Sequence, residues 1–273
     1  MSDDVLLAFL VTLAAGLATG IGSVIAFVAK TTNRGFLSVA LGFSGGVMIY
    51  VSFMEIMPKA LVRLEAAEGT LGGYAWLTAG FLAGMLLMAI VDRVIPSFGH
   101  PHEPMPVEML GNEAARAEYL QQGTLKRMGV FTALAIAIHN FPEGLATFLV
   151  LLEDSSVGIA IAIAIAIHNI PEGIAVSVPL YYDTGKRGKA FLYSLGSGLA
   201  EPLGAIVGYL VLRPFLTDTW LGAIFAGVAG VMVFISLDEL LPTARAYGRP
   251  HLAIYGMMAG MAVMAASLVL FKL

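Results

Sequence analysis

The sequence IAIHNFPEGLA at residues 136–146 recurs as IAIHNIPEGIA at residues 165–175, and nine of the eleven positions are identical. Each copy sets a histidine, an asparagine and a glutamate within a long apolar run. Polar and ionisable side chains in such segments are costly to bury, so they are retained where a function needs them. The repeat therefore indicates a membrane-embedded site built from two related helices.

The composition of the chain indicates that most of it lies in lipid. Of the 273 residues, 58% are hydrophobic and 12% are charged, and this charged share is about half that of a soluble domain. A bilayer is the solvent that suits so much apolar surface. The net charge of −4 carries no signal of a nucleic-acid partner. Because cysteine is absent, any bound metal must take nitrogen and oxygen ligands.

Eight apolar segments are long enough to cross a bilayer, which takes roughly 20 helical residues. The proline-rich polar stretch at 96–127 predicts a cytoplasmic loop, and the other connections are short. We therefore expect an all-α integral membrane protein with one transmembrane transporter domain over residues 1–273. The predicted spans are about 5–29, 36–58, 72–95, 128–152, 156–179, 190–212, 219–242 and 251–271.

The distribution of basic residues predicts the orientation of these spans. Eleven Lys and Arg residues fall on one side of the membrane and four on the other. The positive-inside rule places the richer side in the cytoplasm, so both termini face outward. A second, weaker repeat relates GVMIYVSFMEIMP (46–58) to GVMVFISLDELLP (230–242). Both repeats join helices that run in opposite directions, which is the inverted topology of many transporters.

The spacing within the paired motifs predicts a shared ligand surface. Histidine and glutamate are four residues apart and asparagine and glutamate three, so all three lie on one helix face. The midpoints of spans four, five and six bring both motifs and Glu201 to the same depth. Imidazole with carboxylate suits zinc, iron(II), manganese or cobalt better than calcium or magnesium. The candidate metal ligands are His139, Asn140, Glu143, His168, Asn169, Glu172 and Glu201.

Other features lie outside the paired motifs. The prolines of the motifs, Pro142 and Pro171, are expected to kink both helices. Glycines four residues apart predict close helix contacts and suggest the hypothesis of a homodimer face. They are Gly16/Gly20, Gly204/Gly208 and Gly256/Gly260. A pathway is a further hypothesis, with Glu55 near the entrance and Asp238 and Glu239 near the cytoplasmic exit.

At the paired motifs, and along essentially its whole length, the sequence resembles the ZIP family of zinc- and iron-regulated transporters, in its bacterial ZupT-like branch. The resemblance implies uptake of Zn²⁺, or of Fe²⁺, Mn²⁺, Co²⁺ or Cd²⁺, across the bacterial cytoplasmic (inner) membrane. It implies one site from His139, Glu143, His168 and Glu172, and a second from Asn140, Asn169 and Glu201 with Glu143 and Glu172 bridging. The chain has His168-Asn169 where family members vary.

Two other functions stay open from the residues alone. An intramembrane metal-dependent hydrolase would also use histidine and carboxylate ligands, although no HExxH sequence occurs. A proton or sodium exchanger could use midplane carboxylates, but it would leave the paired histidines without a role. We expect a transporter and no enzyme, with no catalytic residue and no cofactor besides the transported metal.

Overall fold

The computed structural model describes residues 3–28, 34–94, 124–153, 155–212, 217–246 and 250–270, which are helical almost throughout. This confirms the all-α prediction. Of the predicted loop 96–127, residues 96–123 with His100 and His102 lie outside the described residues, whereas residues 124–127 are already helical. The elements, with π-helical turns written η, are α1 Asp3–Val28, α2 Arg34–Val51, η1 Ser52–Ile56, α3 Met57–Val94, α5 Thr124–Glu153, α6 Ser155–Thr184, α7 Arg187–Gly198, α8 Ala200–Val207, η3 Gly208–Leu212, α9 Asp218–Ile235, η5 Ser236–Leu240, α10 Leu241–Ala246 and α11 Pro250–Leu270.

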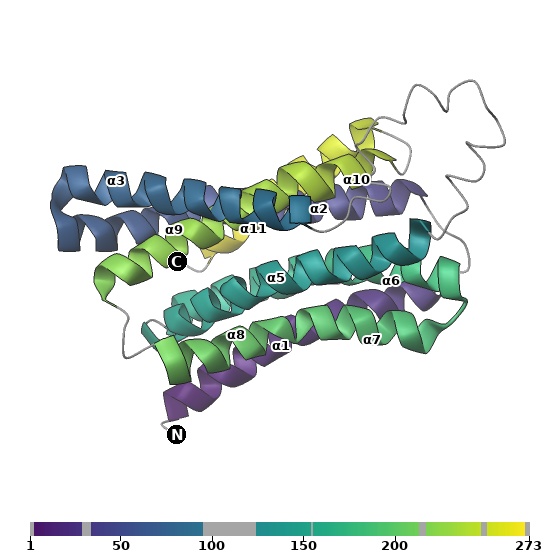
Figure 1. Ribbon diagram of the computed structural model, residues 1–273, viewed down its shortest axis with the longest axis horizontal. Coiled ribbons are helices and arrows are strands. Elements are labelled where there is room, and N and C mark those ends of the chain that lie inside the picture. The colour runs from purple at the N-terminus through teal and green to yellow at the C-terminus, as the bar shows by residue number, and fades with distance from the viewer. Residues whose placement is uncertain are drawn as a thin grey trace.

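The helices form two layers (Figure 1). One layer contains α2, α3, α9, α10 and α11, in which α3 packs along α9 and α11 packs along α2. The other contains α1, α5, α6, α7 and α8, in which α6 packs against α1 and α5, and α5 packs against α8. The layers meet where α2 crosses α6 and α5 crosses α9. Both paired motifs therefore lie in the second layer, on helices that also contact the first.

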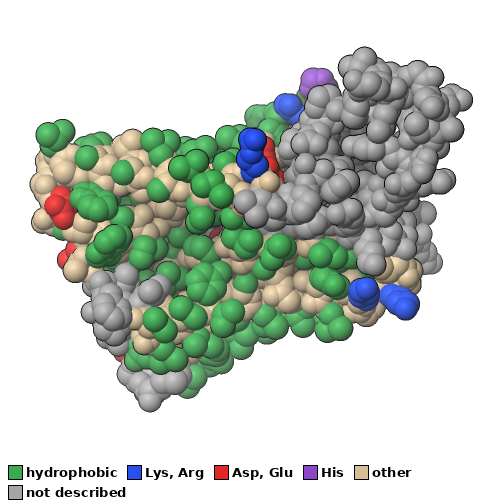
Figure 2. Space-filling view, in the orientation of Figure 1, with side chains coloured by type: hydrophobic (Ala, Val, Ile, Leu, Met, Phe, Trp, Pro, Cys, Tyr) green, Lys and Arg blue, Asp and Glu red, His purple; other side chains and the backbone are tan. Residues whose placement is uncertain are grey.

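The first helix shows how the bundle distributes its side chains. On α1 the large residues Leu10, Leu17 and Ile21 are exposed, whereas the small residues Ala8 and Thr19 are buried. Small residues inside and large apolar residues outside are typical of helices packed in lipid. Apolar side chains also cover much of the face seen in Figure 2. This distribution supports a multi-pass membrane protein.

Several described helices are long and apolar enough to cross a membrane. By length and composition, the described residues contain five such stretches, and shorter apolar helices cover Ile136–Leu152 and Ile161–Ile174. The stretch Ser38–Arg93 contains a chain reversal at Gly69, whose φ is 73°. Glycine adopts this left-handed conformation without a steric penalty.

The helix that begins with α2 is longer than the sequence predicted. A loop was expected after residue 58, but the chain stays helical through Pro58 up to the turn at Gly69. Charged residues ended the apolar span without ending the helix, because this extension packs against α9. Arg63 pairs with Asp218 at 3.2 Å, and the Thr219 hydroxyl bonds Glu68 at 2.6 Å. Glu55 is therefore about 20 Å before the helix end, not close to it.

The second predicted repeat is visible in the backbone geometry. The π-helical turns η1 and η5 occupy equivalent positions in the two copies, SFMEI and SLDEL. In both, the first serine donates a 2.7 Å hydrogen bond to a methionine carbonyl, Ser52 to Met48 and Ser236 to Met232. A proline follows each turn, and the wider turn accommodates its missing N–H. The two segments are thus structural counterparts.

Two further repeats become evident once the packing is known. GLATGIG at 16–22 on α1 corresponds to GLAEPLG at 198–204 near the start of α8, and GFLAGMLLMA at 80–89 on α3 corresponds to GMMAGMAVMA at 256–265 on α11. Their contacts are equivalent. A Cβ on Gly22 would overlap the carbonyl oxygen of Ile170, and one on Gly204 would overlap that of Phe141. Ile170 and Phe141 hold the same position in the paired motifs.

The predicted glycine pairs are helix contacts within one chain. A Cβ on Gly16 would overlap the backbone of Gly198, and one on Gly256 would overlap that of Val39. Gly260 lies in the same way against Phe43. These surfaces are covered inside the chain, so the glycine pairs do not provide the hypothesised homodimer face.

The glycine contacts predict a selective effect of adding one methyl group. We expect G204A to destabilise the protein by about 1–3 kcal/mol, because the methyl group would force α8 away from α5. G196A is the matched control, since the described residues place nothing within 4 Å of a Cβ at Gly196. Thermal unfolding in detergent should show a lower midpoint for G204A only. Equal midpoints would contradict the assigned packing.

Candidate metal centre

The two motifs meet at the middle of their helices. His139 lies near the midpoint of α5 and His168 near that of α6, because each helix has 30 residues. The side chains of both histidines and of Glu143 and Glu172 are at most 2% exposed. Both helices continue as α-helix through their prolines, and the predicted kinks stay a prediction. The structure therefore brings the paired histidines and glutamates together in the core.

The four side chains interleave across the α5–α6 interface. His139 Nε2 is 3.4 Å from Glu172 Oε1 on the opposite helix and 3.7 Å from Glu143 Oε2 on its own. His168 Nε2 is 3.3 Å from Glu143 Oε1 and 4.0 Å from Glu172 Oε1. Each histidine thus lies closest to the glutamate of the other motif. Ligand atoms from His139, Glu143 and His168 all lie within 4.8 Å of one another, a spacing that one metal ion can bridge.

The two asparagines connect this group to the neighbouring helices. Asn140 donates its amide hydrogen to the Ser197 carbonyl at 3.1 Å, and Asn169 donates to the Ala15 carbonyl at 2.9 Å. Asn169 also donates to Glu201 Oε1 at 2.5 Å. These bonds use the amide nitrogens and do not involve the side-chain oxygens of the two asparagines. Glu201, fully buried on α8, is thereby hydrogen-bonded to the second motif.

Many polar atoms of the site have no hydrogen-bond partner among the described residues. They include both ring nitrogens of His139, both carboxylate oxygens of Glu143 and Glu172, Glu201 Oε2, and the side-chain oxygens of Asn140 and Asn169. Buried polar groups in native proteins are nearly always satisfied, and buried unpaired carboxylates are costly. A divalent cation would supply the missing partner for this oxygen and nitrogen set. The donor chemistry therefore fits a transition metal.

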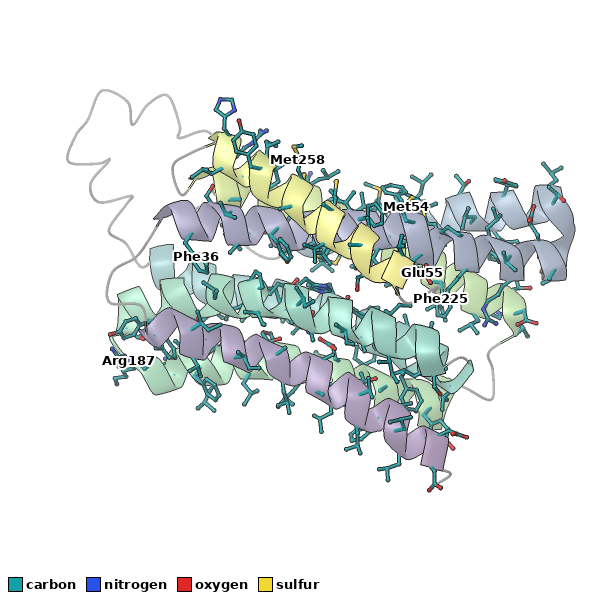
Figure 3. All side chains as sticks on the ribbon, turned by 180° about the vertical axis from the view of Figure 1, so that it is seen from behind. Phe36, Met54, Glu55, Arg187, Phe225 and Met258 are labelled. Carbon is teal, nitrogen blue, oxygen red and sulfur yellow. The ribbon has the colours of Figure 1, made fainter. Side chains whose placement is uncertain are left out.

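The predicted pathway residues lie apart from this centre. Glu55 lies in η1 and is 5% exposed, and its carboxylate forms an ion pair with Lys59 at 2.9 Å. Figure 3 shows Glu55 towards the end that carries both chain termini in Figure 1. Asp238 and Glu239 lie in η5 and form a second acidic group with Asp92. The repeat makes Glu55 and Glu239 counterparts.

Sequence reasoning missed two polar residues that the structure places at these sites. Asp92 joins the group of Asp238 and Glu239, and a carboxylate inside a predicted apolar span was the available signal. Thr19 is fully buried, and within the described residues its hydroxyl has no hydrogen-bond partner. Thr19 corresponds to Glu201 in the GLATGIG and GLAEPLG repeat. That repeat was short enough to pass for ordinary glycine-rich helix sequence.

Comparisons with known proteins identify the family of this chain. A family model described as ZIP Zinc transporter matches residues 4–268. The chain is 62% identical over 269 residues to a zinc transporter ZupT of Oceanobacillus iheyensis, covering 98% of this chain and 99% of that protein. It is 60% identical over 271 residues to a zinc transporter ZupT of Lysinibacillus sphaericus, covering 99% of both. It is 58% identical over 280 residues to one of Nitratidesulfovibrio vulgaris, covering 99% of this chain and all of that protein. The chain belongs to the ZIP family of zinc transporters.

Proposed function

We propose that the protein carries zinc into the bacterial cytoplasm through the centre between α5, α6 and α8. The single observation that carries this proposal is the buried cluster of carboxylates and imidazoles at the middle of apolar helices, several of whose polar atoms have no hydrogen-bond partner among the described residues. The names of the relatives, zinc transporters ZupT, support zinc as the cargo. Iron(II), manganese, cobalt and cadmium are further candidate cargoes, because the same ligands accept them.

The ligands divide between two adjacent positions for the transported ion. His139, Glu143, His168 and Glu172 form one position, in which the two glutamates alternate with the two histidines. The oxygens of Asn140 and Asn169 and the carboxylate of Glu201 form the other, with Glu143 and Glu172 shared. The ion exchanges its water ligands for these groups, and its charge offsets the carboxylates at the bilayer centre. Glu172 and Glu143 belong to both positions, so an ion can move between them without full release.

The path through the membrane follows from the proposed topology. We assign eight crossings in one domain, with α2, η1 and the part of α3 before Gly69 as one crossing and the rest of α3 as the next. Both termini face outward, as the excess of basic residues on the other side indicates. The ion then passes Glu55 first, the centre next, and the Asp238 and Glu239 group last. A homodimer would need a surface other than the glycine contacts.

The first prediction concerns the shared carboxylates. We expect E143A and E172A to abolish zinc uptake into proteoliposomes, because each loss removes one ligand from both positions. D4N is the control, since Asp4 is exposed near the start of α1 and should leave uptake unchanged. Uptake is followed with a zinc-sensitive dye inside the vesicles. Undiminished flux in both glutamate variants would contradict the proposed centre, and flux of protons or sodium alone would favour the exchanger.

The second prediction concerns orientation and uses the absence of native cysteine. Leu71, 88% exposed after the Gly69 turn, is predicted to face outward, and the exposed Gly188 in the first turn of α7 is predicted to face the cytoplasm. A membrane-impermeant maleimide should therefore label L71C in intact cells. It should label G188C only after the cells are permeabilised. The reverse pattern would require the opposite orientation.

The third prediction is competition between protons and the metal. A protonated imidazole nitrogen cannot hold a metal, and histidine titrates within the physiological range. We expect zinc affinity to fall as pH decreases from about 7.5 to 5.5, measured by calorimetry on purified protein. The dependence should be weaker in H139N. An affinity that is flat over this range would exclude the imidazoles as ligands.

A further inference from the structure

A narrow, mainly apolar pocket extends from the metal centre towards the end of the molecule that carries the Gly69 turn. Its walls come from α5, α6, α9 and the helix containing η1, and they include Val51, Ile56, Ile161, Ile165, Phe225 and Met232. The polar residues that line it are Glu143 at the centre, Thr147 one turn further along α5, and Lys59. Apolar walls of this kind form constrictions in ion pathways.

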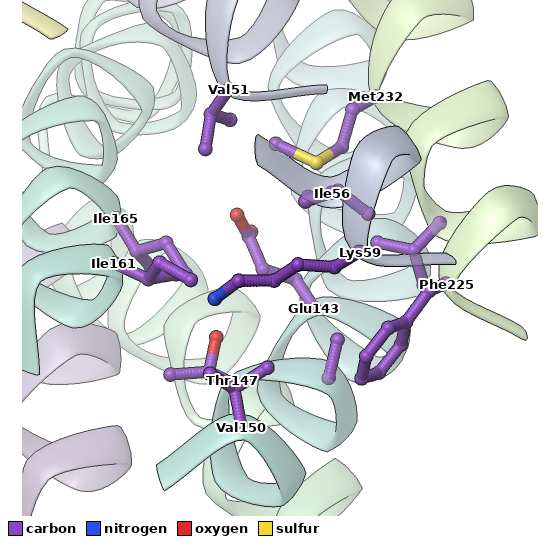
Figure 4. A pocket seen from close by; sticks show the side chains of 12 residues that line it. Val51, Ile56, Lys59, Glu143, Thr147, Val150, Ile161, Ile165, Phe225 and Met232 are labelled. Carbon is purple, nitrogen blue, oxygen red and sulfur yellow. The ribbon is translucent and has the colours of Figure 1, made fainter. Parts of the chain in front are cut away.

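A lysine lies in this constriction. Figure 4 shows the Lys59 side chain extending across the pocket, with its ammonium end towards the side where Glu143 and Thr147 lie. Lys59 Nζ is 2.9 Å from Glu55 Oε1, and the side chain of Lys59 is 31% exposed whereas that of Glu55 is 6% exposed. Among the described residues, Lys59 is the one basic residue that lines the pocket. A positive charge thus occupies the route that a cation would take to Glu143.

The inverted repeat indicates that this lysine is not required by the helix geometry. In the alignment of 46–58 with 230–242, Glu55 corresponds to Glu239 and the following positions pair Lys59 with Thr243. The π-helical turn and its serine bond are present in both copies. The carboxylate is therefore retained on both sides, while the ammonium group occurs on one. An ion pair between residues four apart in a helix also adds little stability.

Electrostatics makes the lysine and the metal ion competitors. Both are attracted by the Glu55 carboxylate, and the apolar walls screen their mutual repulsion less than water does. An ion can approach Glu143 only when the ammonium group withdraws. When Lys59 withdraws, Glu55 becomes available to the ion as its first carboxylate partner. Movement of Lys59 thus opens the pocket and makes the Glu55 carboxylate accessible to the ion in the same step.

We propose that Lys59 is a gating residue of the metal pathway, which holds Glu55 and blocks the pocket above Glu143 until a divalent cation displaces it. This inference rests on the proposed transport function. It assigns to Glu55 a metal-binding role that is conditional on release from Lys59. It also makes Lys59 a determinant of the zinc concentration at which uptake begins.

Zinc uptake kinetics test the gate directly. K59M keeps the aliphatic stem and removes the charge, so we expect KM for zinc to fall. The fall should be at least roughly fivefold, which corresponds to the repulsion in water between a unit charge and a divalent ion about 8 Å apart. K59R should retain the original KM. K186M is the control, because Lys186 is exposed outside the pocket, and it should change nothing. An unchanged KM in K59M would overturn the proposal.

The role of Glu55 is tested by combining two substitutions. E55Q should raise KM, because the ion loses its first carboxylate partner. In the double variant K59M/E55Q, removal of the lysine charge should lower KM less than it does in the original protein, since no carboxylate is released. An equal effect of K59M in both backgrounds would show that Lys59 does not act through Glu55.

Cysteine modification tests the same proposal without transport. Val150 lines the pocket on α5, and V150C would carry the only thiol in the chain. Its rate of modification is measured with two methanethiosulfonate reagents, one carrying a cationic trimethylammonium group and one carrying an anionic sulfonate. We expect K59M to raise the ratio of the cationic rate to the anionic rate severalfold. The same ratio with and without the K59M substitution, or no modification in either protein, would contradict the gate. A changed ratio in a protein that carries no zinc would refute the transport function alone.

Discussion

Three buried carboxylates at the centre of apolar helices impose the main constraint on this protein. Glu143, Glu172 and Glu201 are at most 2% exposed, and their hydrogen-bond partners among the described residues are few. Carboxylates at the middle of a bilayer are stable only beside positive charge or strong donors. The interleaved histidines and the Asn169 amide supply part of that compensation. A divalent ion that passes through the site would compensate the rest of the negative charge. The energetic cost of burying the carboxylates is thereby linked to the function of the site.

The packing around the centre holds these groups in place with small residues. Gly144 lies against the Glu201 backbone and Gly173 lies against that of Thr19, at equivalent positions of the two motifs. Asn140 and Asn169 bond the carbonyls of Ser197 and Ala15, which also correspond in the repeat. The scaffold is therefore symmetric in these glycine contacts and in these two hydrogen bonds. Functional differences stand out as departures from it, such as Glu201 against Thr19.

The sequence predicted the all-helical fold and singled out the residues that the structure brings together in the core, because both have strong local signals. An apolar run of the right length and a nine-in-eleven repeat need no knowledge of tertiary contacts. The helical extension before Gly69 was missed, since the charged residues between 59 and 68 interrupt the apolar run by which the span was recognised. Asp92 was missed because the acidic residues close to it, Asp238 and Glu239, are far along the chain. Thr19 was missed because its correspondence to Glu201 rests on a short glycine-rich repeat. The ligand roles themselves stay predictions until a metal is measured.

The pairing of the helices has a consequence for the order in which the chain is made. α3 packs on α9, α2 on α11 and α1 on α6, so these three pairings join the first half of the sequence to the second, and α5 packs on both α6 and α8. Neither layer can be completed while synthesis has reached only α5. During membrane insertion, Asn140 and Glu143 are therefore made before the helices that cover them in the finished protein. Biogenesis of this fold therefore requires that the polar residues of α5 stay stable in the membrane until the residues beyond 155 have been synthesised and inserted.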